Sequence, residues 1–226
     1  MRRVSFKPIS FLFLFTLILP VLSFASDLPP ADVSMAAEKG LAVFIKSDRL
    51  GARQRLGFLR QEDADVAVLG RSFRLFTIPP DRFTAVEDVA DLQSLSVETG
   101  LWDFLILKHG EAQAVLTVDL MQGVWTPVSI GASGLAKELS RLVEIWPVSE
   151  GYEYRIVRIY QAKADLAEIS KDGRILGVVP LGSYLSATGE EARNYSPERL
   201  RSAKEVVAAL RHAVKKNLEL EGGPWK

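Results

Sequence analysis

Three neighbouring segments constrain the fold of this chain most, because each has the pattern of a β-strand and the turns between them are very short. Residues 101–108 are apolar at nearly every position, which is typical of a central strand covered on both faces. Residues 112–120 alternate apolar and polar side chains, and this period of two indicates a strand with one face in water. Residues 124–130 form the third segment. The turns at 109–110 and 121–123 are too short for a crossover, so the segments predict an antiparallel meander.

Further strands are predicted on both sides of the meander. Residues 152–160 are rich in aromatic and β-branched side chains, which favour strands. Residues 166–179 contain two apolar runs around Asp172-Gly173, a dipeptide that strongly indicates a tight hairpin turn. Residues 72–78 also read as a strand, which Pro79-Pro80 ends because proline cannot continue the hydrogen-bond ladder.

Helices are predicted before, between and after these strands. The first begins near Asp32, and a less regular helical segment follows at 49–60. A short helix is expected to start at the capping box 84–87, whose side chains satisfy free backbone amides. The middle helix follows Ser133. The last helix spans 196–221, with a serine as its N-cap and a proline at its first position.

This order of elements predicts one α+β domain at 26–226, with a central antiparallel sheet packed by N-terminal, middle and C-terminal helices. Its parts are a helical lead at 26–70, the sheet and middle helix at 71–185, and the C-terminal helix at 196–221. In topology alone the order resembles profilin-like and sensor-type α+β domains. No motif residues are shared, and a fold by itself does not imply a function.

The first 25 residues have the layout of a secretory signal peptide. Basic residues at the start precede an apolar run, Pro20 breaks it, and Ser23-Phe24-Ala25 supplies small residues for cleavage after Ala25. The alternative is an uncleaved membrane anchor, but the apolar core before Pro20 is far shorter than the roughly 20 residues that span a bilayer. We therefore expect a protein that is exported to a periplasm or secreted, without a further membrane span.

Charge and composition exclude several classes of function. Removing residues 1–25 takes away three of the 28 basic residues and no acidic one, which leaves an acidic excess of three. Such a chain has no electrostatic reason to bind nucleic acid. The sequence has no cysteine, so disulfides, thiolate nucleophiles, Cys-type metal sites and a lipidated cysteine are all excluded.

Motifs of catalysis, metal binding and cofactor binding are missing. There are two histidines, and neither His109 in a predicted turn nor His212 on the polar side of the last helix has further ligands at metal-binding spacing. The sequence carries no P-loop and no G-x-S-x-G motif. We therefore predict neither a cofactor nor a metal.

One local motif and one strand face suggest ligand contact instead. Gly131, Ala132 and Ser133 lie between a strand and a helix, where free backbone amides bind anions; the more ordinary interpretation is that Ser133 is an N-cap. Trp125 shares a predicted strand face with Pro127 and Ser129. The opposite face carries Val124, Val128 and Ile130, which makes Trp125 a candidate exposed contact.

The favoured hypothesis is a non-catalytic exported domain that binds a partner protein, a peptide or a small ligand. The expected contact residues are Trp125, Ser129, Gly131 and Ser133. The identity of the ligand and the oligomeric state do not follow from the sequence.

The alternative hypothesis is an extracytoplasmic hydrolase or transferase that uses two carboxylates. Asp103 and Asp119 lie on neighbouring predicted strands and would share one cleft. The ordinary interpretation of Asp103 is a position at the rim of the sheet, because an unpaired buried carboxylate is costly. The two hypotheses differ in whether both carboxylates are buried together.

Overall fold

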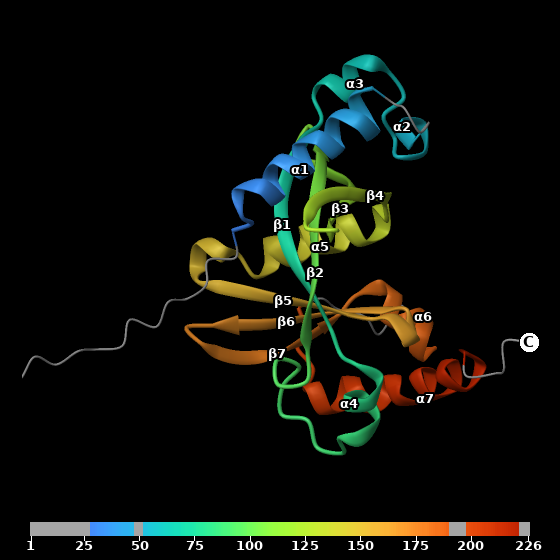
Figure 1. The fold of residues 1–226 in the computed structure, drawn as a ribbon. Helices are drawn as coiled ribbons and strands as arrows, with labels where there is room; N and C mark the ends of the chain where they lie inside the picture. Colours follow the sequence, from blue (N-terminus) through green and yellow to red (C-terminus); the bar gives the residue numbers. More distant parts are fainter. Residues whose placement is uncertain (1–27, 48–51, 190–197, 222–226) are drawn as a thin grey trace, which may run out of the picture.

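The computed structural model describes residues 28–47, 52–189 and 198–221. These residues form one seven-stranded mixed sheet and the helices that pack on it (Figure 1). The strand order is β4-β3-β2-β1-β5-β6-β7. All neighbouring strands are antiparallel except β1 and β5, which are parallel. The predicted α+β class is confirmed. The strands are β1 (Val68–Thr77), β2 (Val97–Lys108), β3 (Glu111–Met121), β4 (Val124–Gly131), β5 (Tyr152–Ile159), β6 (Ala164–Lys171) and β7 (Arg174–Pro180).

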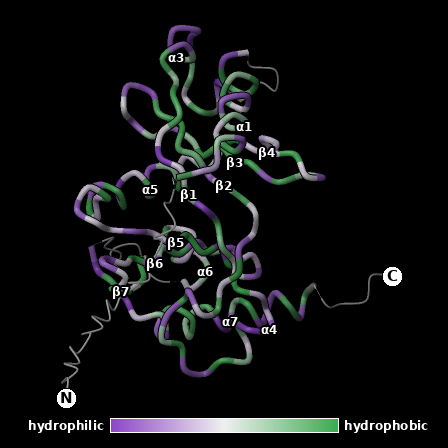
Figure 2. The backbone as a smooth tube through the Cα atoms, turned by 60° about the vertical axis from the view of Figure 1, so that its left-hand side comes forward, coloured by the Kyte–Doolittle hydropathy of each residue, from purple (hydrophilic) through white to green (hydrophobic). Residues whose placement is uncertain are grey.

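Figure 2 shows two groups of helices towards the two ends of the molecule, α1 with α3 and α4 with α7, and α5 at a height between them. Short 3-10 turns lie on either side of β5, at Val148–Glu150 and Tyr160–Ala162. The helices are α1 (Ala31–Leu41), a π-helical continuation η1 (Ala42–Lys46), α2 (Ala52–Arg55), α3 (Gln61–Asp65), α4 (Pro80–Ala85), α5 (Ser133–Ile145), α6 (Gly182–Thr188) and α7 (Ala203–Glu221).

The predicted meander and hairpin are present with the expected turns. His109 and Gly110 have φ of 51° and 83°, and Asp172 and Gly173 have φ of 51° and 72°. Positive φ at both central residues matches the right-handed twist of the paired strands. These turns connect β2 to β3 and β6 to β7.

Three apolar cores stabilise the fold, two on one face of the sheet and one on the other. The α1 core lies between α1, η1 and the strands β2 and β3. The α7 core lies between α4, α7 and the strands β5 to β7. The α5 core fills the opposite face, where α5 covers the middle of the sheet. The first two cores are thus separated along one face, and this separation positions the site described below.

Gly40 permits the close packing of α1 on the sheet. A Cβ atom at Gly40 would lie 2.7 Å from Cβ of Pro127 in β4 and 3.0 Å from the methyl groups of Leu116 in β3. These distances are shorter than van der Waals contact, so a larger residue would push α1 away from the strands. The glycine that lowers helix propensity in the sequence therefore has a packing role.

Three helix predictions are wrong in whole or in part. The helix expected to start at the capping box 84–87 is absent, because α4 begins at Pro80 and ends at Ala85, and Val86 has an extended backbone. Pro80 occupies the first turn of α4, where proline needs no amide partner. Of the segment expected to be helical at 49–60, the structure describes residues 52–60, and these contain only the single turn α2. The last helix begins at Ala203, since Arg201 pairs with Val178 of β7 as a β-bridge instead.

The helix N-cap observed at the start of α7 is Ser202, whose hydroxyl accepts a hydrogen bond from the amide of Glu205 at 3.2 Å. The predicted cap, Ser196, lies outside the described residues, as do residues 1–25 with the predicted signal peptide. The predicted helical lead at 26–70 also contains the first residues of β1. Within the described ranges no helix is long and apolar enough to cross a membrane.

Candidate ligand-binding groove

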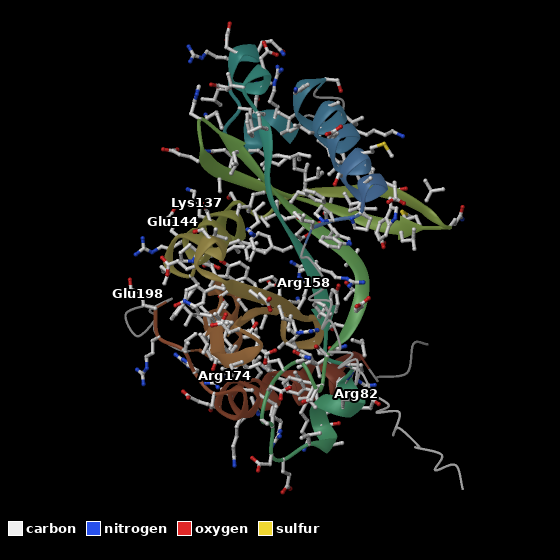
Figure 3. The ribbon with its side chains drawn as sticks, turned by 90° about the vertical axis from the view of Figure 1, so that its left-hand side faces the viewer. Arg82, Lys137, Glu144, Arg158, Arg174 and Glu198 are labelled. Atoms are coloured by element: carbon white, nitrogen blue, oxygen red, sulfur yellow. The ribbon has the colours of Figure 1, made fainter. Side chains whose placement is uncertain are left out.

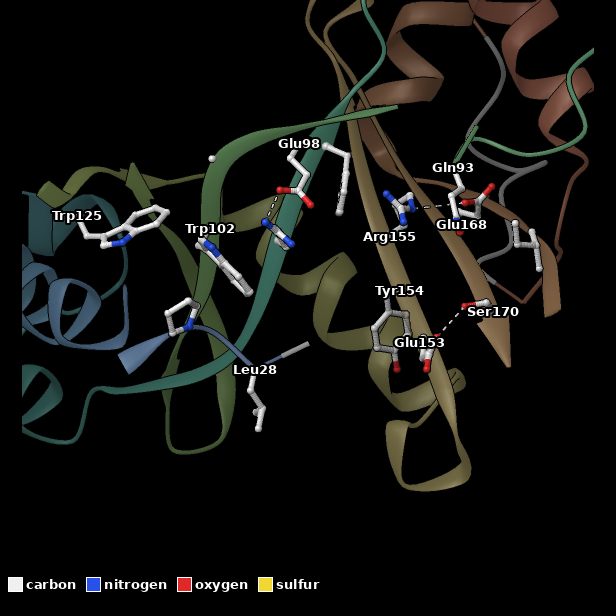
Figure 4. Close-up of a pocket in the computed structure, with 15 residues that line it drawn as sticks. Leu28, Gln93, Glu98, Trp102, Trp125, Glu153, Tyr154, Arg155, Glu168 and Ser170 are labelled. Atoms are coloured by element: carbon white, nitrogen blue, oxygen red, sulfur yellow. Dashed lines mark hydrogen bonds and ion pairs between the residues drawn. The ribbon is translucent and has the colours of Figure 1, made fainter. Parts of the chain in front are cut away.

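A hollow of about 560 Å³ lies on the sheet face that carries two cores, in the gap between the α1 core and the α7 core (Figure 4). We call it the sheet groove. Strands β1, β2, β5 and β6 contribute most of its lining. Its residues are Leu28, Pro30, Arg74, Phe76, Gln93, Glu98, Gly100, Trp102, Trp125, Glu153, Tyr154, Arg155, Glu168, Ser170 and Ile175.

The two-residue period of the strands explains why polar side chains line this groove. In β5, Ile156 packs into the α5 core, and Arg155 therefore points to the other face. In β6, Ala167 and Ile169 pack into the α5 core in the same way, and Glu168 lies between them on the groove side. Neither helix group covers this stretch of the sheet, so charged side chains occupy it.

Two arginines flank one aromatic ring on the floor of the groove. The guanidinium carbon of Arg155 lies 4.0 Å from the ring centre of Phe76, and that of Arg74 lies 5.9 Å from the same centre. Such contacts stabilise a cation by its attraction to the face of the ring. Arg74 also forms an ion pair with Glu98, and both side chains are about half exposed. The arginines are therefore held in place while part of each stays open to the groove.

Glu168 is the buried carboxylate of the groove, with 3% of the residue exposed. Its Oε1 accepts a hydrogen bond from the amide of Leu92, and its Oε2 lies 3.9 Å from Nε of Arg155. Burial raises the pKa of Glu168, and the Leu92 hydrogen bond and the Arg155 charge oppose that rise only in part. Glu168 thus anchors the 86–96 segment to β6.

Tryptophans form the opposite end of the groove. Trp102 is buried in the α1 core with its ring beneath Arg74, at 5.9 Å from the guanidinium carbon. Trp125 is half-buried and packs against the same core. Figure 4 shows both tryptophans on one side, with Arg155 between them and Glu168.

The predicted assignment of the β4 side chains to the two faces of the strand is wrong. Val124 is 65% exposed and Val128 is 40% exposed, whereas Trp125 and Ile130 both pack against the α1 core. A register shift between Pro127 and Ser129 is the cause, because the extra residue of a bulge reverses the alternation along the strand. Trp125 therefore lines the sheet groove with its ring partly in the core.

A second hollow of about 470 Å³ extends the groove towards the β6–β7 turn. It shares Gln93, Glu153, Ser170 and Ile175 with the first hollow. Asp91, Ser94 and Gly173 complete its lining. The two hollows form one elongated groove across the strands.

The other predicted contact residues lie apart from the groove. Ser129 and Ser133 are exposed, and neither they nor Gly131 line either hollow. Ser133 is the first residue of α5 and not its N-cap. The N-cap is Ala132, which has a φ of 51° and makes no capping hydrogen bond through its side chain. The N-cap interpretation of Ser133 is therefore wrong.

Asp103 is enclosed on the opposite face of the sheet, and its predicted position at the rim is also wrong. The residue is 1% exposed, and its carboxylate accepts hydrogen bonds from Thr117 Oγ1 at 2.6 Å and from Arg158 at 3.2 Å. Arg158 also donates to Asp165 at 2.7 Å. We call Asp103, Thr117, Arg158 and Asp165 the buried ion cluster. Figure 3 shows Arg158 near the middle of the molecule.

The buried ion cluster does not pair the two predicted carboxylates. Asp119 is half-buried, two residues along β3 from Thr117, and the partners of Asp103 are the hydroxyl of Thr117 and the cation of Arg158. Burial raises the pKa of Asp103, while the positive charge of Arg158 and the Thr117 hydrogen bond act against the rise. Arg158 was not predicted as a site residue, because a single arginine in a strand carries no motif.

Comparison with models of protein families, with curated proteins and with solved structures finds no match for this chain. Over the ranges that the structure describes, no group of three histidine, aspartate or glutamate side chains could hold a metal ion. The sheet groove and the buried ion cluster are the two features that bear on function.

Proposed function

We propose that this protein is a non-catalytic exported domain that binds a ligand in the sheet groove. The observation that carries the proposal is a large hollow in which two partly exposed arginines lie between tryptophans and carboxylates. Binding sites typically combine an apolar lining with a few polar groups that orient the ligand. Here Phe76, Trp102 and Trp125 supply the apolar surface, and Arg74 and Arg155 supply the orienting donors.

The enzymatic alternative has less support. A general base needs access to the proton that it removes. Asp103 is enclosed and already accepts hydrogen bonds from Thr117 and Arg158. Such a carboxylate is suited to holding strands together, and we favour binding over hydrolysis.

Native mass spectrometry of the protein purified from its own source tests the proposal. We expect a retained mass on the wild type that is lost in Arg155→Gln, because this change removes a cation from the groove. Arg141→Gln is the matched control, since Arg141 lies on α5, is 60% exposed and lines neither groove hollow. Equal retention in both variants would contradict the groove assignment.

Export belongs to the same proposal and has its own test. From the sequence we expect cleavage after Ala25, which would give an N-terminus at Ser26. N-terminal sequencing of the protein from its source checks this. Detection of the intact N-terminus in the membrane fraction would instead support an anchor.

A further inference from the structure

The two ends of the sheet groove differ in character. At one end, the half-buried Trp125 offers aromatic surface, and the mostly buried Trp102 lines the same end. At the other end, Asp91 and Glu153 are among the residues that line the second hollow, and no lysine or arginine is among the described residues of that lining. A ligand that fills the whole groove therefore needs an apolar group at one end and a cationic group at the other.

The acidic end keeps capacity to bind a cation. Oδ1 of Asp91 accepts a hydrogen bond from the amide of Ser94 at 2.7 Å. Oε2 of Glu153 accepts one from the hydroxyl of Ser170 at 3.4 Å. Each carboxylate has two oxygens and about four acceptor sites. One hydrogen bond to each therefore leaves sites for an ammonium or guanidinium group.

The length of the groove indicates a chain-like ligand. From Trp102 in β2 to Ile175 in β7 the groove crosses four strand intervals. At the usual spacing between strands this is about 19 Å, which an extended polypeptide of about six residues covers. The arginines in the middle of this path can donate to the backbone carbonyls of such a chain.

We propose that the sheet groove, whose role as a ligand site this inference presupposes, binds an extended peptide of about six residues. A large apolar side chain of the peptide lies against Trp125 at the end that the mostly buried Trp102 also lines, and a lysine or arginine lies beside Asp91 and Glu153. A polyanion such as a nucleic acid is disfavoured, because the carboxylates at the acidic end repel it.

Isothermal titration calorimetry with two capped hexapeptides tests this assignment. One has the sequence Trp-Gly-Ser-Gly-Ser-Lys, and the other carries glutamine in place of lysine. We expect the lysine peptide to bind wild type at least about fivefold more tightly than the glutamine peptide, and this preference to weaken with salt. The variant with Asp91→Asn and Glu153→Gln should lose the preference, because its acidic end has no charge.

The control variant Glu144→Gln should keep the preference, since Glu144 is exposed on α5 and lines neither groove hollow. Equal binding of both peptides to wild type, or an unchanged preference in the double variant, would overturn the inference. If no peptide binds while the retained mass still depends on Arg155, the peptide class is wrong and the groove remains the ligand site. If no peptide binds and the retained mass does not depend on Arg155 either, the proposed function itself is wrong.

Discussion

Arg155 and Arg158 lie on the same strand, three residues apart, and the fold gives them different roles. Arg155 stacks on Phe76 in the sheet groove, where 26% of its side chain is exposed. Arg158 bridges Asp103 of β2 and Asp165 of β6 on the face that α5 covers. An odd separation along a strand places two side chains on opposite faces. The two side chains are nearly equally exposed, at 26% for Arg155 and 23% for Arg158, so their partners distinguish them. Arg158 bridges two carboxylates on different strands, whereas Arg155 stacks on a ring that lines the sheet groove.

The largest effect is expected in the buried ion cluster. Arg158→Met leaves the enclosed carboxylate of Asp103 without its cation. Removing one partner of a buried ion pair typically costs about 3–5 kcal/mol, so we expect a loss of about 3 kcal/mol in the free energy of unfolding. Urea unfolding measures it. A loss below about 1 kcal/mol would show that the charge of Arg158 does little to stabilise the enclosed carboxylate of Asp103. The two arginines would then not differ in their contribution to stability.

The pH dependence of stability gives a smaller effect with a defined sign. Burial raises the pKa of Asp103 in the folded protein above its ordinary value. The folded state therefore binds more protons than the unfolded state at intermediate pH, and stability falls as pH rises from the ordinary pKa through the raised one. Asp103→Asn should flatten this fall. Urea unfolding of both proteins between about pH 4 and about pH 8 tests it, and parallel curves would contradict the assignment.

The smallest expected effect on stability is in the groove. Arg155→Gln removes the stacking contact with Phe76 and the 3.9 Å ion pair with Glu168, whose Oε1 keeps its hydrogen bond from the Leu92 amide. Because Arg155 is partly exposed, each of these two contacts is worth about 1 kcal/mol or less. The free energy of unfolding of this variant should therefore change less than that of Arg158→Met. Thermal unfolding of the two variants side by side sharpens the comparison. Equal destabilisation would mean that Arg155 is also a structural residue.

Much of the architecture could be predicted from local sequence patterns. The Asp172-Gly173 turn and the alternation in 112–120 predicted strands that are present as β6–β7 and β3. Helix starts were less predictable. The capping box at 84–87 follows the pattern of a helix start, yet α4 begins at Pro80 and ends at Ala85. The start of the last helix depends on Arg201 pairing with Val178, a contact between distant residues that no local pattern reports.

The candidate site was only partly predictable. Trp125 was predicted as a contact residue, and it does line the sheet groove. Its ring lies on the core side of β4 and not on the predicted outer side, because the bulge beside Pro127 changes which side chains face the core. Arg74, Arg155 and Glu168 drew no attention, since single charged residues in strands carry no motif. They lie on three strands that are brought together by the parallel pairing of β1 with β5.

The sequence by itself determined the α+β class, the tight turns and the absence of cysteine chemistry, because hydrophobic period, turn residues and composition act locally or over the whole chain. Only contacts between distant elements settle which stretch of the sheet lies open between two cores, that Asp103 is enclosed beside Arg158, and that two tryptophans and two arginines line one groove. These outcomes depend on strand order, register and helix placement. They arise from contacts between residues far apart in the chain, for which local sequence carries no signal.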